Sequence, residues 1–276
     1  MIKFQNSGKI KFVTKLFSNF FYYIQDKFLT YYFQLKILIK KIDVTNYSLT
    51  IVTAADSSHF KSALQLINSI LNYEPQSKII FYDLGLQEDE KKVLLDFKIK
   101  YKTFNFDSYP NFYRLEQKDA GAYAWKPAII YEEMLIESSL LIWMDAGNKV
   151  IKNLKRLKYA IILNGFFSPL SSGNVQRWTH ESTLDKLLVS KNIFKKRNLN
   201  AALIGINTHN NKIKNLIKIW YTNSKNKDLI LPDGAGKHNH RWDQSLLTLE
   251  YYKQVNKYFF PRTNKLFGVL IHQDID

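Results

Sequence analysis

The stretch Leu140–Val150 reads LLIWMDAGNKV, and five apolar residues precede its one acid, Asp145. A continuous apolar run of this length, without alternation, is typical of a strand buried on both faces of a parallel sheet. An ionised carboxylate inside such a sheet is costly unless it meets solvent or a partner. We therefore expect the strand to end at Asp145, with the carboxylate at an edge of the sheet. The simpler alternative is that Asp145 only caps a turn.

Similar apolar runs precede this one, and segments with helical spacing separate them. Strands are expected at 48–53, 78–82, 101–106 and 140–144, and helices at 60–73, 87–97 and 123–136. This alternation predicts an α/β fold, in which crossover connections build a Rossmann-like, mostly parallel central sheet flanked by helices. Ligands bind beyond the carboxyl ends of strands in such sheets. Asp56, after the first strand, and Asp145, after the fourth, are expected at that edge.

The second half of the chain, 151–276, is less regular. Strands are expected at 165–169, 200–207 and 266–272, helices at 213–221 and 243–252, and polar loops at 171–183 and 231–241. The His-x-His pair of His238 and His240 is expected in a flexible loop, because no other potential metal ligand clusters beside it. His59 and His209 are expected at helix starts without a chemical role.

Residues 1–46 form a separate basic segment. A helical apolar stripe recurs every four residues, at Phe12, Leu16, Phe20, Ile24 and Phe28. Residues 1–41 hold eight lysines against one acid, and no apolar run there approaches the ~20 residues of a membrane span. Two interpretations stay open. Residues 10–41 lie on an anionic membrane surface as an amphipathic helix, or the helix packs on the main domain, 47–276.

Composition limits the chemistry available. The 276 residues include no cysteine, which excludes disulfides, thiolate catalysis and cysteine-bound zinc. The formal net charge of +16 favours anionic partners, but the lysines are scattered and no nucleic-acid-binding motif occurs, so nucleic acid is disfavoured. No phosphate loop, GxGxxG or GxSxG motif appears. No cleavable signal sequence is visible, and we expect a cytoplasmic protein, with a peripheral position on the inner face of the cell membrane as the alternative.

Four motifs, taken in order over 47–276, resemble GT-A glycosyltransferases, most closely family 8. They are TAAD at 53–56, similar to the nucleotide-binding start; DAGNKVIKNL at 145–154, similar to a strand ending in Asp-x-Asp; NAALIGIN at 200–207, similar to an Asn-Ala-Gly strand; and DQS at 243–245, similar to an Asp-Gln helix start. The resemblance implies a GT-A-like fold. It also implies transfer of a sugar from a nucleotide sugar, expected to be a UDP-sugar, to a glycan or lipid-linked acceptor.

The resemblance also implies roles for individual residues. The donor site would include Thr53, Ala54, Asp56, Asn200 and Asn207. Lys126 stands in the helix where the family places a donor-contacting cation, and a cation there neutralises a leaving diphosphate. Gln244 falls near the family's reaction centre, and Asp243 would be the base if the reaction inverts configuration. The simpler alternatives are a solvated lysine and a helix-capping aspartate.

Arg177, Trp178 and His180 form a compact cluster in the polar loop 171–183, where an acceptor would approach. An indole stacks on the apolar face of a sugar ring, and Arg or His binds hydroxyls or phosphate. The alternative is a loop that packs through Trp178 and leaves its polar neighbours in solvent.

Gly147 departs from the Asp-x-Asp pattern, because it stands where the second acid belongs. The expected cofactor is Mn²⁺ or Mg²⁺, a hard cation that takes oxygen ligands from carboxylates and substrate phosphates. Asp145 and His272, which stands where the family places a metal-ligating histidine, would then hold a weaker site completed by water. Alternatively, Asp274 replaces the missing acid, or Lys, Arg and helix N-termini bind the diphosphate without metal.

Two functions are therefore carried forward. The first is a glycosyltransferase of hexosyltransferase type, with retention of configuration favoured by the resemblance alone. The second is a catalytically inactive GT-A-fold module that binds a nucleotide, a glycan or nucleic acid. The missing second acid and the high net charge motivate the second function.

Overall fold

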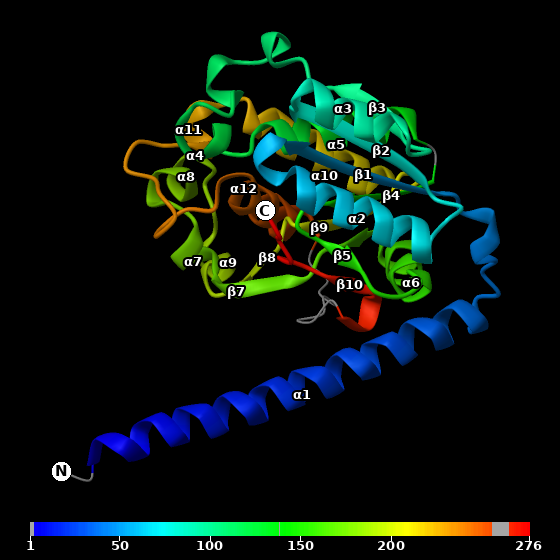
Figure 1. The fold of residues 1–276 in the computed structure, drawn as a ribbon. Coiled ribbons are helices and arrows are strands. Elements are labelled where there is room, and N and C mark those ends of the chain that lie inside the picture. Colours follow the sequence, from blue (N-terminus) through cyan, green and yellow to red (C-terminus); the bar gives the residue numbers. More distant parts are fainter. Residues whose placement is uncertain (1–2, 138, 256–264) are drawn as a thin grey trace.

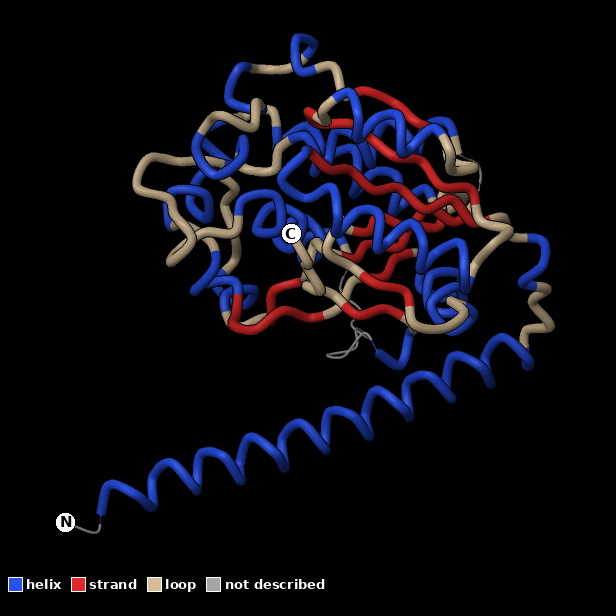
Figure 2. Tube along the Cα trace, in the orientation of Figure 1, coloured by secondary structure: helices blue, strands red, loops and turns tan. Residues whose placement is uncertain are grey.

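A computed structural model describes residues 3–137, 139–255 and 265–276, with residues 3–19 and 22 as backbone alone (Figure 1). Its centre is a six-stranded sheet in the order β3-β2-β1-β4-β9-β6 (Figure 2). These strands are β1 (Leu49–Asp56), β2 (Lys78–Gly85), β3 (Lys100–Thr103), β4 (Leu140–Met144), β6 (Phe166–Phe167) and β9 (Leu203–Asn207). The first four run parallel, whereas β9 is antiparallel to β4 and β6. The predicted α/β fold with a mostly parallel sheet is confirmed.

Helices cover both faces of this sheet (Figure 1). One face carries α2 (Phe60–Tyr73), α3 (Glu88–Leu95) and α6 (Lys155–Asn164), and the other carries α5 (Trp125–Ile136), α10 (Asn211–Ser224) and α12 (Trp242–Gln254). The short helices are η1 (Val44–Asn46), η2 (Ser57–His59), η3 (Phe106–Ser108), η4 (Asn111–Tyr113), α4 (Lys118–Gly121), α7 (Val175–Trp178), α8 (Glu181–Lys186), α9 (Lys191–Phe194), α11 (Lys227–Ile230) and η5 (Lys265–Phe267).

Two small antiparallel pairs complete the fold: β5 (Lys149–Val150) with β10 (Val269–Leu270), and β7 (Leu170–Asn174) with β8 (Arg197–Leu199). The strand expected at 266–272 is therefore reduced to two residues after η5. The expected loop at 171–183 is wrong, because it contains the end of β7, all of α7 and the start of α8. Side chains cap both helices: Asn174 accepts from Arg177 N, and His180 accepts from Ser182 N.

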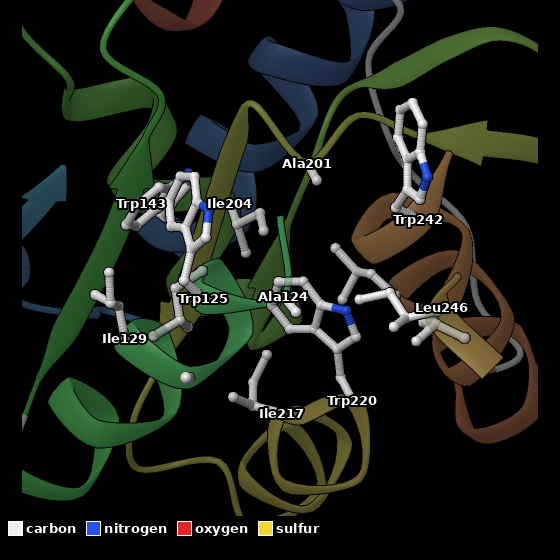
Figure 3. Close-up of a cluster of buried hydrophobic side chains, with 14 of the residues drawn as sticks. Ala124, Trp125, Ile129, Trp143, Ala201, Ile204, Ile217, Trp220, Trp242 and Leu246 are labelled. Atoms are coloured by element: carbon white, nitrogen blue, oxygen red, sulfur yellow. The ribbon is translucent and has the colours of Figure 1, made fainter. Parts of the chain in front are cut away.

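Alternate side chains of the apolar strands point to opposite faces of the sheet and pack into hydrophobic clusters on both faces. On β1, Ile51 packs with the α2 and α6 side, while Val52 packs with the α5 side. Figure 3 shows the cluster on the α5 side of the sheet. There Trp143 of β4 lies against Trp125 of α5, with ring centroids 6.1 Å apart. Each fully buried large apolar side chain contributes roughly 1.5–3 kcal/mol. The sheet is thus held rigidly from both sides, and its carboxyl edge is a fixed platform for loops.

The helix α1 (Lys3–Ile39) extends along the underside of the domain (Figure 1). It packs on α6 and η5, and there Phe33 and Ile37 are only 1% and 5% exposed. Phe20 and Phe28 of the predicted stripe are exposed instead, while Phe12 and Leu16 lie outside the described side chains. Packing on the main domain is thus observed, but through a different face from the predicted stripe. The division at residues 46 and 47 stays a prediction.

In the described part of the chain, none of the helices combines the length and the hydropathy that crossing a membrane requires.

The short element α4, with the two residues after it, is a left-handed turn rather than a regular right-handed helix. Asp119, Ala120, Ala122 and Tyr123 have φ values of 53°, 50°, 52° and 53°, and Gly121 between them has 65°. For a residue other than glycine this conformation costs roughly 1–2 kcal/mol. Such turns persist where the surroundings enforce them, often beside functional sites. Here the Ala120 carbonyl is held by Trp125 Nε1 at 3.2 Å.

Replacing Ala120 by glycine is expected to stabilise the protein. Glycine removes the left-handed penalty but adds unfolded-state entropy, so we expect a net gain of about 0.5–1 kcal/mol in the free energy of unfolding. The matched control is Ala160→Gly in the right-handed helix α6, which should lose about 1 kcal/mol or more. Urea unfolding monitored by circular dichroism measures both. A loss of stability in Ala120→Gly would show that the turn carries no such penalty.

Candidate functional site

The carboxyl ends of β1 and β4 meet at one edge of the sheet. The two strands pair in parallel, with Val52 opposite Trp143, so the residues that end them lie side by side. A cleft of about 430 Å³ opens there, lined by Asp56 of β1 and by Asp145, which follows β4. Both acids that the sequence placed at this edge therefore face the same cavity.

Asp145 is fixed by its own strand and by the segment before β9. Its backbone N–H donates to Ala202 O at 3.0 Å, and Trp143 Nε1 donates to its carboxylate at 2.7 Å. Asn148 Nδ2 also donates to Ala202 O, at 2.6 Å, which pins the turn after β4 to the same carbonyl. The side chain of Asp145 stays 35% exposed. It is therefore oriented by hydrogen bonds yet open to the cleft.

Lys126, in the first turn of α5, is a buried cation at the bottom of the cleft. Its residue is only 4% exposed, and its Nζ lies 2.9 Å from Asp145 Oδ1 and 3.5 Å from Asp243 Oδ2. Burial opposes the charge, but the two carboxylates outweigh burial and hold the pKa of Lys126 above its usual range. Lys126 is therefore charged at neutral pH and is not the solvated helix lysine of the simpler alternative.

Asp243 and Gln244 open α12 beside this lysine. Burial raises the pKa of Asp243 to about 6; the charge of Lys126 opposes this shift and that of Asp145 adds to it. Asp243 Oδ2 makes no hydrogen bond with the described residues, since 3.5 Å to Lys126 Nζ is too long for a good one. Gln244 Oε1 accepts from Ala201 N at 3.2 Å. Asp243 therefore lines the cleft as a buried carboxylate whose Oδ2 keeps free acceptor capacity.

The missing side chain at Gly147 is explained by Asp274. A Cβ at residue 147 would lie 2.1 Å from Asp274 Oδ1. Gly147 is not among the residues with positive φ, so its backbone does not require glycine; a side chain there would require the exposed Asp274 carboxylate to move. The Asp274 carboxylate therefore occupies the volume into which a second acid of Asp-x-Asp would project. That Asp274 replaces the missing acid as a metal ligand stays a prediction.

The C-terminal segment that carries Asp274 is tied across this edge of the cleft. Gln273 N donates to Gly147 O at 2.6 Å. Asp276 Oδ1 accepts from Lys61 N at 2.9 Å and from Ser62 N at 3.2 Å, at the first turn of α2. His272 lines the cleft and is exposed. Gln65 Nε2 also donates to Gln273 O at 2.9 Å, and Ile275 N donates to Ser62 Oγ at 2.9 Å, so hydrogen bonds hold the tail on both sides of Asp274.

The donor set does not fit a ready-made divalent-metal site. Asp145, His272 and Asp274 line one cleft, but among the described residues no three His, Asp or Glu side chains gather closely enough to hold a metal ion. One oxygen of Asp145 is already engaged by Lys126 and Trp143. The cations that line the cleft are the side chains of Lys126, Lys237 and Arg241.

The structure brings most of the predicted site together. The cleft is lined by Ala54, Asp56, Lys126, Asp145, Gly147, Asn200, Asp243, Gln244 and His272. Thr53 lies behind it, fully buried, and its hydroxyl has no hydrogen-bond partner among the described residues. Asn200 Oδ1 accepts from Ala202 N at 2.9 Å and so shapes the wall beside Asp145.

Asn207 lies away from the cleft, contrary to expectation. Because β9 runs antiparallel to β4, Asn207 pairs with Leu140 at the start of β4, while Leu203 pairs with Met144. Four residues of strand, roughly 13 Å, separate the two ends. Its side chain instead accepts from His209 N at 3.0 Å. Only the start of the 200–207 segment contributes to the cleft.

Arg177, Trp178 and His180 also do not line the cleft. The guanidinium groups of Arg177 and Arg241 lie 4.6 and 4.2 Å from the Trp178 ring centroid. Trp178 Nε1 donates to Ser172 O at 2.7 Å, and His180 Nδ1 caps α8. The packed-loop alternative describes these contacts better than an open sugar platform.

His240 is a correction to the expected flexible loop, because it is fully buried. Its Nδ1 accepts from His180 N at 3.1 Å and its Nε2 lies 3.1 Å from Ile230 O. Burial lowers the pKa of His240 to about 4, so the ring is neutral and joins the 171–183 segment to the loop before α12. Its role here is structural.

Several cleft residues were missed by sequence reasoning. His59 lies 3.1 Å from Asp56 Oδ1, and the hydrogen bond and charge of Asp56 raise the pKa of His59 against the effect of partial burial. Lys237 and Arg241 bring positive charge from the loop before α12. The spacing of the acid and histidine in Asp56-Ser57-Ser58-His59 was the one available signal. Nothing in the sequence placed residues 237–241 beside Asp145.

A family model described as a protein of unknown function, DUF1647, matches residues 27–131. The match includes Asp56 and Lys126 but ends before Asp145. No curated protein matches the chain.

Solved structures resemble the chain at low identity. The apo bifunctional glycosyltransferase WbbM has 14% identity and a TM-score of 0.47, covering 75% of this chain and 38% of its own, so this chain spans well under half of that protein. The galactosyltransferase LgtC, with donor and acceptor sugar analogues, has 18% identity and a TM-score of 0.45, covering 72% and 69%. Core-mannan synthase A from Aspergillus fumigatus, in a Mn/GDP form, has 8% sequence identity and a TM-score of 0.48. The match covers 77% of this chain and 72% of that protein. These matches indicate a similar fold.

Restoring an acid at residue 147 is expected to release the C-terminal segment. In Gly147→Asp the new side chain collides with Asp274, so the bonds of Gln273 to Gly147 and of Asp276 to α2 should loosen. We expect amide hydrogen exchange at Lys61 and Ser62 to accelerate by at least about tenfold. The double variant Gly147→Asp/Asp274→Ala restores the space and should exchange more slowly than the single variant. Equal exchange in Gly147→Asp and the unmodified protein would contradict this account.

Proposed function

We propose that this chain is a glycosyltransferase that moves a sugar from a nucleotide-diphosphate sugar, with a UDP-sugar the first candidate, to a glycan or lipid-linked acceptor. The observation that carries the proposal is the convergence of Lys126, Asp145 and Asp243 in an open cleft at the carboxyl edge of the sheet. A buried cation between two acids, one with a raised pKa, is typical of a functional site rather than of a core. The reaction class is proposed from the resemblance of the sequence motifs to those of family 8.

Lys126 supplies the electrostatic part of the mechanism. When a glycosidic bond to a diphosphate breaks, negative charge develops on the departing phosphate oxygen. A preorganised ammonium in a site with little water stabilises that charge without reorganisation. Lys237 and Arg241 line the same cleft and add positive charge from a loop. Lys126 is held in place by Asp145 and Asp243 before any ligand arrives.

The nucleotide part of the donor is expected to bind at the carboxyl end of β1. Ala54 is small and leaves the cleft open beside β1, and Asp56 presents a carboxylate at the strand end. A carboxylate at the edge of the cleft can accept hydrogen bonds from ribose hydroxyls. His59, hydrogen-bonded to Asp56, fixes the orientation of that acid.

Asp243 and Gln244 are the proposed groups at the reaction centre. If the acceptor hydroxyl attacks with inversion, Asp243 removes its proton, and a pKa near 6 keeps it ionised but basic at neutral pH. If configuration is retained, as the resemblance favours, the Gln244 amide is the candidate beside the anomeric carbon. The stereochemistry of the product distinguishes these roles.

The alternative is a catalytically inactive module that binds a nucleotide, a glycan or nucleic acid. Gly147 in place of an acid is the observation that favours it. A binding module would hold a sugar nucleotide without releasing the nucleotide, whereas an enzyme would release it. Strong, salt-sensitive binding to DNA or RNA without turnover would favour the nucleic-acid form.

Nucleotide release from a panel of sugar nucleotides, with candidate acceptors, tests the proposal. We expect Asp145→Asn and Lys126→Met each to lower kcat by about a hundredfold or more, because Lys126→Met removes the cation that stabilises the departing diphosphate and Asp145→Asn removes the carboxylate that positions this cation. The matched control is the exposed pair Lys186 and Asp228, 2.9 Å apart and outside the cleft, in the variants Lys186→Met and Asp228→Asn. Full activity in the cleft variants, confirmed as folded by circular dichroism, would rule out this mechanism.

Metal dependence is measured in the same assay. Mn²⁺ or Mg²⁺ bound by Asp145 and His272 stays a prediction, and no step above requires it. Since the donor set does not converge, we expect release to continue in EDTA. Complete loss in EDTA with recovery in Mn²⁺ or Mg²⁺ would show that the reaction requires a metal, and weaker recovery in Asp274→Ala would then identify Asp274 as one of the residues that hold it.

The raised pKa of Asp243 predicts the pH profile. If its ionised form is required, kcat/KM should rise through an apparent pKa of about 6 and level off above it. Stability has the opposite dependence on pH. Because the folded-state pKa lies above the usual ~3.9, the free energy of unfolding falls as the pH rises from about 4 to about 6. Asp243→Asn should remove the stability slope. A kcat/KM that is flat from pH 5 to about pH 7 would exclude ionisation of Asp243 as a requirement.

A further inference from the structure

The helix α1 has two apolar faces, and only one of them is used by the domain. The packed face consists of Asp26, Thr30, Phe33 and Ile37, each at most 5% exposed. Their spacing of three or four residues places them on one side of the helix. Phe33 and Ile37 belong to the hydrophobic core that includes β1 and α6.

The second face carries eight large apolar side chains in solvent. They are Phe20 (63% exposed), Phe21 (57%), Ile24 (47%), Phe28 (74%), Tyr31 (58%), Leu35 (56%), Leu38 (72%) and Ile39 (70%). With about 100° of rotation per residue, this outer face lies roughly opposite the packed one. The domain therefore cannot cover it without giving up the contacts of Phe33 and Ile37. Contiguous exposed apolar surface of this kind marks an interaction site.

Lysines border the outer face, and no acid does. Lys27 lies along one edge and Lys36 toward the other, while Lys40 and Lys41 follow the end of α1. Their ammonium groups lie over neighbouring rings, Lys27 at 5.4 Å from the Tyr23 centroid and Lys36 at 4.7 Å from that of Tyr32. The one acid of residues 1–41, Asp26, is on the packed face, only 4% exposed.

We propose that the outer face of α1 docks on an anionic lipid surface, with the helix lying in the plane of the interface. An apolar face bordered by lysines is the pattern that combines insertion among acyl chains with attraction to acidic headgroups. A second copy of the same helix is a poorer occupant, because its border would bring lysines against lysines with no acids to pair them. This proposal does not depend on the glycosyltransferase assignment.

Vesicle flotation of the full chain tests the docking. We expect binding to phosphatidylcholine vesicles with about one-third phosphatidylserine, and weaker binding at raised salt or to pure phosphatidylcholine. The variant Phe28→Gln/Leu35→Gln/Leu38→Gln should bind at least about tenfold more weakly, since glutamine keeps helix propensity but removes the apolar contact. The control Leu95→Gln/Leu135→Gln/Ile136→Gln removes exposed apolar side chains elsewhere and should bind normally; the exposures there are 71%, 66% and 61%.

A charge series completes the test. Lys27→Gln/Lys36→Gln/Lys40→Gln should lower binding to the acidic vesicles, whereas the control Lys92→Gln/Lys98→Gln/Lys218→Gln, exposed on the domain, should not. Circular dichroism of each variant confirms that the domain is folded. The proposal is overturned if the unmodified chain ignores acidic vesicles, or if both triple-lysine variants bind equally. It is also overturned if light scattering shows a dimer that only the outer-face variant dissolves and no vesicle binding occurs.

Discussion

The buried charge of Lys126 is the constraint on which the cleft depends. An ammonium that is 4% exposed must be compensated, and its two partners come from different elements: Asp145 follows β4, and Asp243 opens α12. Removing one partner would leave Lys126 with a single carboxylate, and removing both would leave its buried charge uncompensated, which typically costs several kcal/mol. Electrostatics thus fixes the positions of α5, β4 and α12 relative to one another. The same ion pairs therefore set the geometry that a ligand meets and stabilise this edge of the sheet.

This arrangement couples an anionic ligand to the protonation of Asp243. Without ligand, one ammonium faces two carboxylates, and burial leaves the pKa of Asp243 at about 6. A diphosphate that pairs with Lys126 reduces the stabilisation that this cation gives to ionised Asp243. The pKa of Asp243 is then expected to rise further. A base that becomes easier to protonate as the donor binds is better suited to accept a proton from an acceptor hydroxyl. Lys237 and Arg241, on the loop before α12, offset part of the added negative charge.

More of the fold than of the site could be predicted from the sequence. Apolar runs and helical spacing were enough for the parallel strands, and the acid after Leu140–Met144 was rightly expected at the sheet edge. The direction of β9 has no local signal, so Asn207 was assigned to the wrong edge. Contacts between distant segments were equally invisible: Asp274 fills the space of Gly147, and Arg241 covers Trp178. These depend on tertiary packing, which spacing along the chain does not encode.

The N-terminal helix shows the same limit from the other side. Periodicity identified the stripe that includes Phe20 and Phe28, and a stripe of this kind normally packs on a core. In α1, Phe33 and Ile37 do that instead, and they stand on the opposite side of the helix. A helix with two apolar faces looks in sequence like a helix with one broad face. Only the placement of the domain against one of them reveals that the other needs a partner outside the chain.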